Sequence, residues 1–449
     1  MKKKTKFILY NQYGLLLPIA QRLEEEGYEC FSYYSALSHV DGYVGKDGGK
    51  GLINIVDDFY DTIMDLKDEK DNVVIVIDDN ARGDEMDYLS SEGWHIVGSS
   101  NFSDEMEYDI TKGIELAKKI GLEIPPSVSF NDFQQAHDWL EQQLKSGNEL
   151  KLVFKGDGPD MAGGSFTYLA NNIEEMIKQL DWVHKEMESG KCKVETFRFK
   201  KIIDGLEADF SAWYNGDKFA KTLNLDFEQK KIHGLGQAEG CLGQIVTFLD
   251  PTGQPYFKHF EKLLPELKGT TANEWAINNI INKDDHKPNF LEWTPRHGWD
   301  SHMGEMAILK DAGKSIGEFY EHLAFKTPFP ADFFPYGKYS CGVRFYTGGI
   351  GKEPDKAAGK PIFWDPKFDD NLWWYSIKKN EDETYELTGN PVGVAVFVGD
   401  TPQQAIDRCY KFLDPKKDYL TLPNIFYSEN IGEGVEEEIK TLKEWKIII

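Results

Sequence analysis

One ten-residue stretch, 289–298, brings a carboxylate, a hydroxyl and a guanidinium close together. It reads Asn-Phe-Leu-Glu-Trp-Thr-Pro-Arg-His-Gly, an apolar strand end followed by a glycine-containing turn. Glu292 and Thr294 alternate with apolar neighbours, so a strand would place both oxygen-bearing side chains on one face, where hard oxygen donors suit Mg²⁺ bound to phosphates. Arg296, two residues further on, is placed to hold an anion beside the metal. The stretch predicts metal–phosphate chemistry.

A second stretch, 150–165, reads as a buried strand that ends near Lys155 and continues into a glycine-rich loop. Glycines let backbone N–H groups approach anionic oxygens closely, and a lysine supplies a positive charge. The loop lacks the GxxxxGK[ST] sequence of a helix-opening phosphate loop. Because strand-rich sequence separates the two stretches, together they predict a nucleotide held between two β-sheet layers.

The 449-residue chain has a globular composition, with 40% apolar and 13% aromatic residues. This length predicts roughly two to four domains. The 51 basic and 76 acidic residues give a formal charge of −25. A charge of this sign opposes nonspecific binding to nucleic acid and to anionic membranes.

Cysteine usage and hydropathy indicate a protein of the cytoplasm. The five cysteines are widely spaced, odd in number and form no CxxC pair, which is typical of reduced thiols rather than of disulfides or a zinc site. The N-terminal apolar run is too short for a signal peptide, and no run approaches the roughly 18 apolar residues of a membrane span. A soluble, cytoplasmic protein without membrane partners is expected.

Three regions follow from the order of strand and helix signals. Residues 1–103 alternate between the two, which predicts a parallel α/β domain whose first turn lacks the GxGxxG dinucleotide fingerprint. Its expected strands are 7–10, 30–34, 73–77 and 95–97, its expected helices include 16–25 and 85–89, and 53–66 continues the alternation.

Residues 104–330 begin with helical sequence and then become strand-rich. We expect a helix over 104–120, a second over 130–144 and a third over 173–188. Strands are expected near 194–199, 206–214, 219–225 and 275–281, around the strand that carries Glu292. Residues 331–449 predict a smaller α+β domain with strands at 340–346, 373–377 and 392–398. Thr401 and Pro402 form an N-cap and a first helical position for a helix over 402–413.

The motifs, taken in order, resemble those of ATP-grasp ligases, and most closely those of the phosphoribosylamine–glycine ligase (glycinamide ribonucleotide synthetase) family. Residues 155–158 are similar to the family's Lys-Ala-Asp-Gly, and 205–210 to its Gly-Glu-Glu-Ala-Ser-Phe. Residues 292–298 resemble the family's Glu-Phe-Asn-x-Arg-Phe-Gly. Residues 392–402 resemble the Val-Leu-Gly-Val-Thr-x-x-Gly-Asp-Thr of its closing domain. The resemblance runs along nearly the whole chain.

The resemblance implies an ATP-grasp architecture, with an N-terminal parallel α/β domain, a central ATP-grasp region and a C-terminal α+β domain. It also implies a reaction in which ATP phosphorylates a carboxylate and an amine attacks the acyl phosphate, giving an amide, ADP and phosphate. The cofactors would be ATP and Mg²⁺ or Mn²⁺. The substrates would be a small carboxylate, glycine or another amino acid, and an amine.

The family motifs assign a role to each matching residue. The implied metal ligands are Glu292, Thr294 and Asn278, the last from an adjacent predicted strand. The implied catalytic residues, which offset charge on the transferring group or lie beside it, are Arg296, Lys231 and Asp226. The implied nucleotide-binding residues are Lys155, Asp157, Gly158, Gly163, Gly164, Glu195 and Glu207.

Several positions depart from the family pattern. The first turn, Gly-Gly-Arg-Glu in the family and part of its phosphoribosylamine site, is Gln-Tyr-Gly-Leu at 12–15. This change favours a different amine. Thr294 replaces the family's metal-binding Asn, and the hinge acidic pair falls near 200–201 unless Glu195 is its counterpart.

Plainer interpretations compete with these assignments. Lys155 alone would be a strand-end lysine, and Glu292 could form a structural salt bridge with Arg296. Glu207, Asp226 and Lys231 are equally consistent with ordinary charged strand and turn residues. The alternative for the whole protein is a non-catalytic nucleotide-binding or scaffold protein that kept the fold and lost turnover.

Overall fold

The computed structural model describes residues 4–35, 45, 47–157, 167–190, 194, 196–230, 241–348 and 358–449. The chain forms two compact units. Unit 1 comprises Met1–Gly113, Glu207–Asn278 and Glu292–Ile449, and unit 2 comprises Ile114–Leu206 and Asn279–Leu291. The three-region division expected from the sequence stays a prediction.

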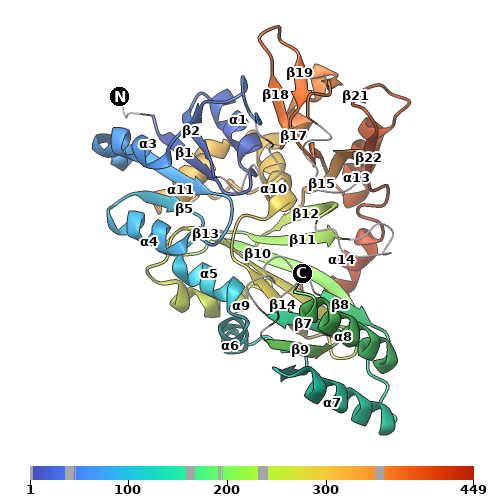
Figure 1. The fold of residues 1–449 in the computed structure, drawn as a ribbon. Coiled ribbons are helices and arrows are strands. Elements are labelled where there is room, and N and C mark those ends of the chain that lie inside the picture. Colours follow the sequence, from blue (N-terminus) through green and yellow to red (C-terminus); the bar gives the residue numbers. More distant parts are fainter. Residues whose placement is uncertain are drawn as a thin grey trace. The chain divides into compact units, whose positions relative to one another are not determined.

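A five-stranded parallel sheet begins unit 1 (Figure 1). Its order is β3-β2-β1-β4-β5, with β1 Lys6–Asn11, β2 Glu29–Tyr34, β3 Ile55–Val56, β4 Val73–Ile77 and β5 His95–Val97. One face packs against α1 (Leu17–Glu25) and α11 (Ile316–Ala324), and the other against α3 (Phe59–Leu66) and α4 (Gly83–Ser91). Because both faces are covered, β4 is buried at every position and reads as a continuous apolar run. The predicted parallel α/β region is confirmed.

Nine described strands form a second, larger sheet. Its order is β14-β13-β10-β11-β12-β15-β20-β17, with β22 paired to β15. The bounds are β10 Gly205–Tyr214, β11 Leu223–Gln229, β12 Gly243–Leu249, β13 Asn273–Asn282, β14 Pro288–Thr294, β15 Tyr339–Thr347, β17 Leu372–Trp374, β20 Gly393–Gly399 and β22 Ile425–Tyr427. Strands expected in the central and C-terminal regions are therefore hydrogen-bonded neighbours in one sheet.

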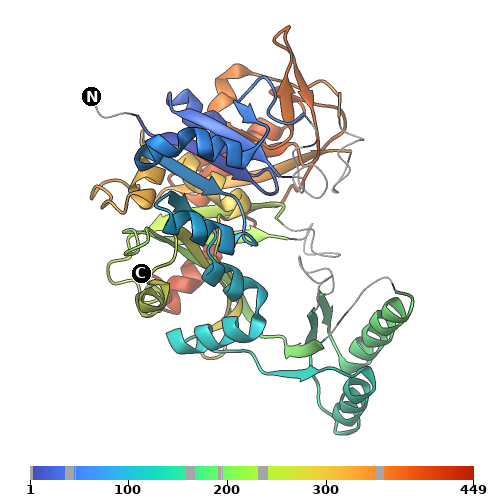
Figure 2. The ribbon, with the colours of Figure 1, turned by 60° about the vertical axis from the view of Figure 1, so that its left-hand side comes forward.

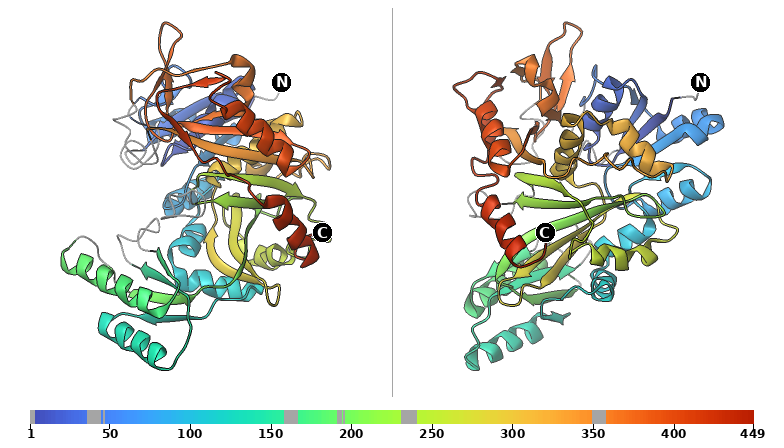
Figure 3. Two further views of the ribbon diagram at one scale, coloured as in Figure 1. Left: turned by 90° about the vertical axis from the view of Figure 1, so that its right-hand side faces the viewer. Right: turned by 180° about the vertical axis from the view of Figure 1, so that it is seen from behind.

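Two helices pack on this sheet within unit 1. Helix α10 (Trp299–Asp311) contacts β12, β15 and β20, and α13 (Pro402–Leu413) contacts β15 and β20 (Figure 3). At Gly304 an added Cβ would lie 2.7 Å from Ser340 Oγ and 3.1 Å from Val246 Cγ2. A larger side chain would therefore separate α10 from β12 and β15.

Unit 2 contains a four-stranded antiparallel sheet of order β6-β9-β7-β8. The strands are β6 Ser127–Phe130, β7 Leu152–Asp157, β8 Thr167–Ala170 and β9 Thr196–Lys201. Helices α7 (Phe133–Lys145) and α8 (Ile173–Glu188) lie side by side against it (Figure 2). Phe154, Phe197 and Phe199 contribute to the apolar core that the sheet shares with α7 and α8.

The remaining elements are shorter or lie at the edges. They are α5 Asn101–Tyr108, α6 Ile110–Ile120, α9 Lys258–Leu263, α14 Val435–Glu444, β16 Phe363–Trp364, β18 Ile377–Lys379, β19 Tyr385–Leu387, β21 Leu420–Thr421, and the 3₁₀ turns Lys67–Asn72, Leu264–Leu267 and Pro366–Asn371. No helix in the described part of the chain is long and apolar enough to cross a membrane.

Two predicted helices were placed wrongly. The helix expected over 104–120 is broken at Asp109, whose backbone is extended and whose carboxylate accepts the N–H groups of Thr111 and Lys112. A side chain that accepts these bonds starts a new helix instead of continuing the old one. The helix expected from 130 starts at Phe133, because Asp132 caps it and the preceding residues form β6.

Two strand predictions also differ from the structure. The strand expected at 219–225 lies at Leu223–Gln229, because Tyr214 and Phe219 pair across the turn that precedes it. The segment 373–377 contributes to β17 and β18, which belong to different sheets. Strand β12 and helices α9, α10 and α11 were not predicted.

Candidate active site

Polar side chains cover one face of four neighbouring strands, β14, β13, β10 and β11. They stand at alternate positions: Glu292 and Thr294; Glu274 and Asn278; Glu207, Asp209 and Ser211; Asn224, Asp226 and Glu228. The intervening residues, which include Phe210, Leu225 and Trp293, are buried and apolar. Period-two alternation in adjacent strands thus builds a carboxylate-rich face, which we call the acidic face.

The three predicted metal ligands lie together on this face. Asn278 Nδ2 donates to Glu292 Oε1 at 3.4 Å, and Thr294 Oγ1 donates to Asn278 Oδ1 at 3.2 Å. Strands β13 and β14 are neighbours, as the role of Asn278 requires. A carboxylate, an amide and a hydroxyl oxygen form a donor set of the hard type that suits Mg²⁺. Metal binding itself remains a prediction.

Asp209 and Asp226 are directly opposite each other on β10 and β11. Their Oδ1 atoms are buried and accept no hydrogen bond from any residue that the structure describes. Burial and then the neighbouring carboxylates raise the pKa of Asp226 well above its usual value. Burial also raises the pKa of Asp209 well above its usual value. The pair therefore needs a proton or a bound cation.

Among the residues that the structure describes, Lys230 is a basic residue that contacts the acidic face. Its Nζ lies 3.2 Å from Glu207 Oε1 and 3.1 Å from Glu228 Oε2. Burial opposes its charge, but Glu228 and Asp209 act more strongly together and raise the pKa of Lys230. The predicted Lys231 lies outside the described residues. Of the predicted residues on this face, Glu207 therefore binds a lysine of the chain, and Asp226 faces another carboxylate.

We predict that Asp226→Asn stabilises the metal-free protein at pH 8 but not at pH 4. The unfolded chain ionises Asp226 near its usual pKa of 3.8, whereas the folded chain retains the proton to a higher pH. Wild-type stability therefore falls as pH rises above this value and levels off beyond the folded pKa. An asparagine avoids that loss, so we expect a gain of about 1–3 kcal/mol at pH 8, measured by urea unfolding in EDTA.

Asp217→Asn provides the matched control, because Asp217 is exposed in the turn between β10 and β11. This variant should follow the wild-type curve at both pH values. Equal or lower stability of Asp226→Asn at pH 8 would mean that the folded protein already neutralises this carboxylate.

Arg296 lies in the turn after β14 and forms ion pairs within unit 1. Its Nε is 3.1 Å from Asp79 Oδ1 and 3.1 Å from Glu107 Oε1. Burial opposes the guanidinium charge, yet Asp79 and then Glu107 raise the pKa of Arg296. These pairs hold the turn against Asp79, which follows β4, and against Glu107, which lies on α5. That Arg296 also holds an anion beside the metal remains a prediction.

A buried charged group that sequence reasoning missed lies at the start of α10. Arg344 on β15 donates from Nη2 to Asp300 Oδ1 at 2.6 Å and from Nε to Asp300 Oδ2 at 2.9 Å. Tyr375 OH donates to Asp300 Oδ1 at 2.8 Å. Asp300 and Arg344 are 44 positions apart, so no local spacing could have indicated this pair.

In unit 2, basic side chains share one face of the four-stranded sheet. Lys155 on β7 is paired in register with Arg198 on β9, and Lys200 lies two residues further along β9. Lys200 Nζ donates to the carbonyl oxygens of Phe290 and Leu291 at 3.0 and 3.3 Å. The apolar residues that alternate with them face the core under α7 and α8.

The predicted nucleotide-binding residues of unit 2 are only partly described. Lys155 and the backbone of Asp157 belong to β7. Gly158, Gly163, Gly164 and Glu195 lie outside the described residues. The roles assigned to all of them remain predictions.

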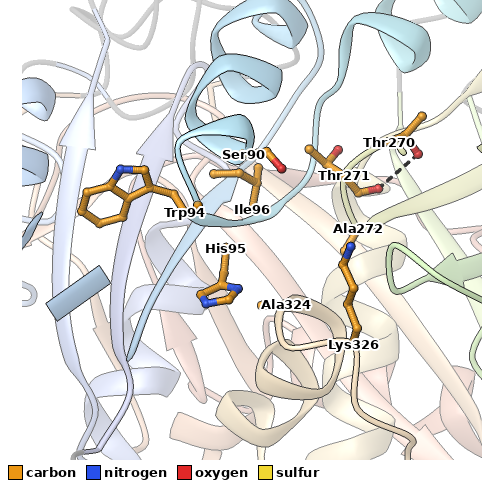
Figure 4. A pocket seen from close by; sticks show the side chains of 10 residues that line it. Ser90, Trp94, His95, Ile96, Thr270, Thr271, Ala272, Ala324 and Lys326 are labelled. Atoms are coloured by element: carbon orange, nitrogen blue, oxygen red, sulfur yellow. Dashed lines mark hydrogen bonds between the residues drawn. The ribbon is translucent and has the colours of Figure 1, made fainter. Parts of the chain in front are cut away.

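A pocket of about 230 Å³ lies elsewhere in unit 1 (Figure 4). Part of its lining comes from Trp94 just before β5, His95 of β5, Thr271 before β13, and Lys326 after α11. No predicted site residue lines this pocket. It offers no carboxylate for a metal, so the acidic face remains the candidate site within unit 1.

The chain has the ATP-grasp fold, in agreement with the predicted fold class. Phosphoribosylamine–glycine ligase from Thermotoga maritima has a TM-score of 0.66 and 16% identity, over 95% of this chain and all of that one. The biotin carboxylase domain of Hydrogenobacter thermophilus 2-oxoglutarate carboxylase, solved with MgADP and bicarbonate, has a TM-score of 0.65 and 13% identity, over 99% of each chain. N5-carboxyaminoimidazole synthetase from Staphylococcus aureus has a TM-score of 0.54 and 14% identity, over 91% of this chain and 98% of that one.

Sequence similarity is more limited. A phosphoribosylamine–glycine ligase from Archaeoglobus fulgidus is 23% identical over 155 residues, or 33% of this chain. The match spans 32% of that relative's length. No protein-family model matches the chain. The predicted resemblance to this family is confirmed as a distant one.

Proposed function

We propose that the protein is an ATP- and Mg²⁺-dependent ligase that joins a small carboxylate to an amine. The observation that carries the proposal is the Glu292–Asn278–Thr294 cluster in a chain with the ATP-grasp fold. Glu292, Asn278 and Thr294 would hold Mg²⁺ or Mn²⁺, which would supply positive charge to offset the negative charge that develops on the phosphates.

The basic face of unit 2 supports the phosphate-binding half of this proposal. Lys155 and Arg198 are cations on the face opposite the apolar core. Cations stabilise a transferring phosphoryl group by charge and position, and no covalent enzyme intermediate is required. We assign Lys155 to the phosphates of ATP and Glu292 to the metal.

The reaction has two balanced steps. A carboxylate oxygen of the substrate attacks the γ-phosphorus of ATP, the bond to the β-phosphate oxygen breaks, and ADP leaves. The amine nitrogen then attacks the acyl carbon, the bond to the phosphate oxygen breaks, and the nitrogen loses a proton. Asp226 is the candidate base for that proton, because a carboxylate with a raised pKa is a stronger base than an exposed one.

The first turn of the chain supports an amine other than phosphoribosylamine. The carboxylate of Asp78, after β4, accepts the N–H groups of residues 12–15 at 2.7, 3.1, 3.1 and 3.1 Å. Gly14 has φ 90°, which aims successive N–H groups at one point. A fully buried side chain of the protein thus occupies the anion-binding turn. We infer that this turn holds no substrate phosphate.

ADP release and thermal unfolding, measured in one preparation, test the proposal. Mg-ATP at about 100 times its Kd should stabilise the fold by about 2.7 kcal/mol and raise Tm. ADP release should then require both an amino acid and an amine, and amines without a phosphate should support it better than phosphoribosylamine.

Each other outcome has a distinct meaning. A Tm increase without ADP release for any amino acid and amine in the panel would favour a non-catalytic nucleotide-binding protein. No Tm increase would contradict nucleotide binding. Phosphoribosylamine as the best amine would support the ligase but contradict the inference from Asp78.

A further inference from the structure

Three ionisable side chains converge where α10 meets the acidic face, beside the start of β13. Glu274 is the second residue of β13, and His302 and Glu305 are three residues apart on one side of α10. One ligand atom from each lies within 4.8 Å of the other two. The exposed fractions are 2%, 1% and 1%. Among the described residues, no other group of histidine, cysteine and carboxylate side chains meets this spacing.

His302 presents to this cluster a nitrogen that has no partner among the described residues. Its Nε2 is 2.7 Å from Tyr320 OH, whereas its buried Nδ1 has no hydrogen-bond partner in the described part of the chain and lies 3.8 Å from Glu305 Oε2. Metal-bound histidines commonly hydrogen-bond through the other ring nitrogen, which fixes the ring.

The two carboxylates are held in place by neutral donors. Glu274 accepts from Ser211 Oγ at 2.5 Å and from the Gly298 N–H at 3.0 Å. Glu305 accepts from Trp213 Nε1 at 2.9 Å and from Asn224 Nδ2. In the described part of the chain, neither carboxylate has an ion pair with lysine or arginine.

Two buried carboxylates without a cation are unfavourable when both are ionised. A divalent cation would neutralise both and would supply the missing partner of His302 Nδ1. One imidazole with two carboxylates suits Zn²⁺, Mn²⁺ or Fe²⁺ better than Mg²⁺, which prefers oxygen ligands.

We propose that Glu274, His302 and Glu305 bind one divalent transition-metal ion as a structural centre, separate from the metal of the proposed reaction. The ion would link the start of β13 to α10. It would therefore stabilise unit 1 without contacting ATP, and its binding would not depend on nucleotide.

Elemental analysis of the purified full-length protein, without added nucleotide, is the first test. We expect about one equivalent of transition metal per chain. After prolonged chelation, adding Zn²⁺ or Mn²⁺ should raise Tm by about 2 °C or more. Co²⁺ should give visible absorption bands from bound nitrogen and oxygen ligands.

His302→Ala and the isosteric Glu305→Gln should each abolish the bound equivalent and the metal-dependent Tm increase. His184→Ala is the matched control, since His184 is half exposed on α8 in unit 2 and should leave both unchanged. If either variant fails to fold, the measurements on the wild-type protein still decide.

Two results would overturn the proposal. One is a wild-type protein that contains no metal, whose Tm does not change with Zn²⁺ or Mn²⁺ and which gains no absorption bands with Co²⁺. This result would show that Glu274 and Glu305 share a proton instead. Full metal content in folded His302→Ala and Glu305→Gln would place the ion elsewhere. Because no ATP is present, failure here is distinguishable from failure of the proposed ligase activity.

Discussion

Glu292→Gln is expected to lower the rate of ADP release by about 100- to 1,000-fold, the range seen when one preorganised charge-stabilising group is lost. The amide keeps the shape of the side chain but removes the negative charge that would hold Mg²⁺. Glu292 is exposed, and Asn278, which donates to it, remains in place. The fold should therefore survive, and Tm without ligands should change by less than about 2 °C.

The measurement is steady-state ADP release at saturating ATP over a range of Mg²⁺ concentrations. Partial recovery at high Mg²⁺ would be expected, because weakened binding is offset by mass action. Glu261→Gln is the matched control, since Glu261 is exposed on α9 and belongs to no predicted site. A Glu292→Gln enzyme with the rate of the control would rule out the assigned metal role.

The grouping of Glu292, Thr294 and Asn278 could be predicted because its signal is local. In β14 the polar residues Glu292 and Thr294 alternate with buried neighbours, and this pattern gives both strand and face. The adjacent strand carrying Asn278 was likewise predicted from strand signals in the sequence. The N-terminal sheet was predicted for a similar reason: strands buried on both faces, such as β4, read as unbroken apolar runs.

The deeper groups could not be predicted because their partners are remote in sequence. Glu274 and Glu305 come from β13 and α10, and Asp300 pairs with Arg344 on β15. Helix α10 carries few local signs of its own, since it is buried almost throughout and lacks the polar face that marks an amphipathic helix. Likewise, nothing local to Asp78 shows that it binds the turn at residues 12–15.

Arg344→Met is expected to lower the free energy of unfolding by about 3–5 kcal/mol, the cost of leaving one partner of a buried ion pair without the other. Asp300 is fully buried and Arg344 is 2% exposed. Without the guanidinium, the Asp300 carboxylate keeps the hydrogen bond from the Tyr375 hydroxyl but no ion pair within the described part of the chain. Urea denaturation, followed by the fluorescence of the buried tryptophans, measures the loss.

Two further variants separate a lost charge pair from general disruption of the core. Lys338→Met breaks the exposed Lys338–Asp400 pair and should cost less than about 1 kcal/mol. Adding Asp300→Leu to Arg344→Met removes the uncompensated carboxylate, so the double variant should regain most of the lost stability. If the double variant were as unstable as Arg344→Met, packing of the arginine stem between α10 and β15 would account for the loss instead of charge. In that case the arginine side chain would stabilise the protein by packing, and the unpaired Asp300 carboxylate would not itself be destabilising.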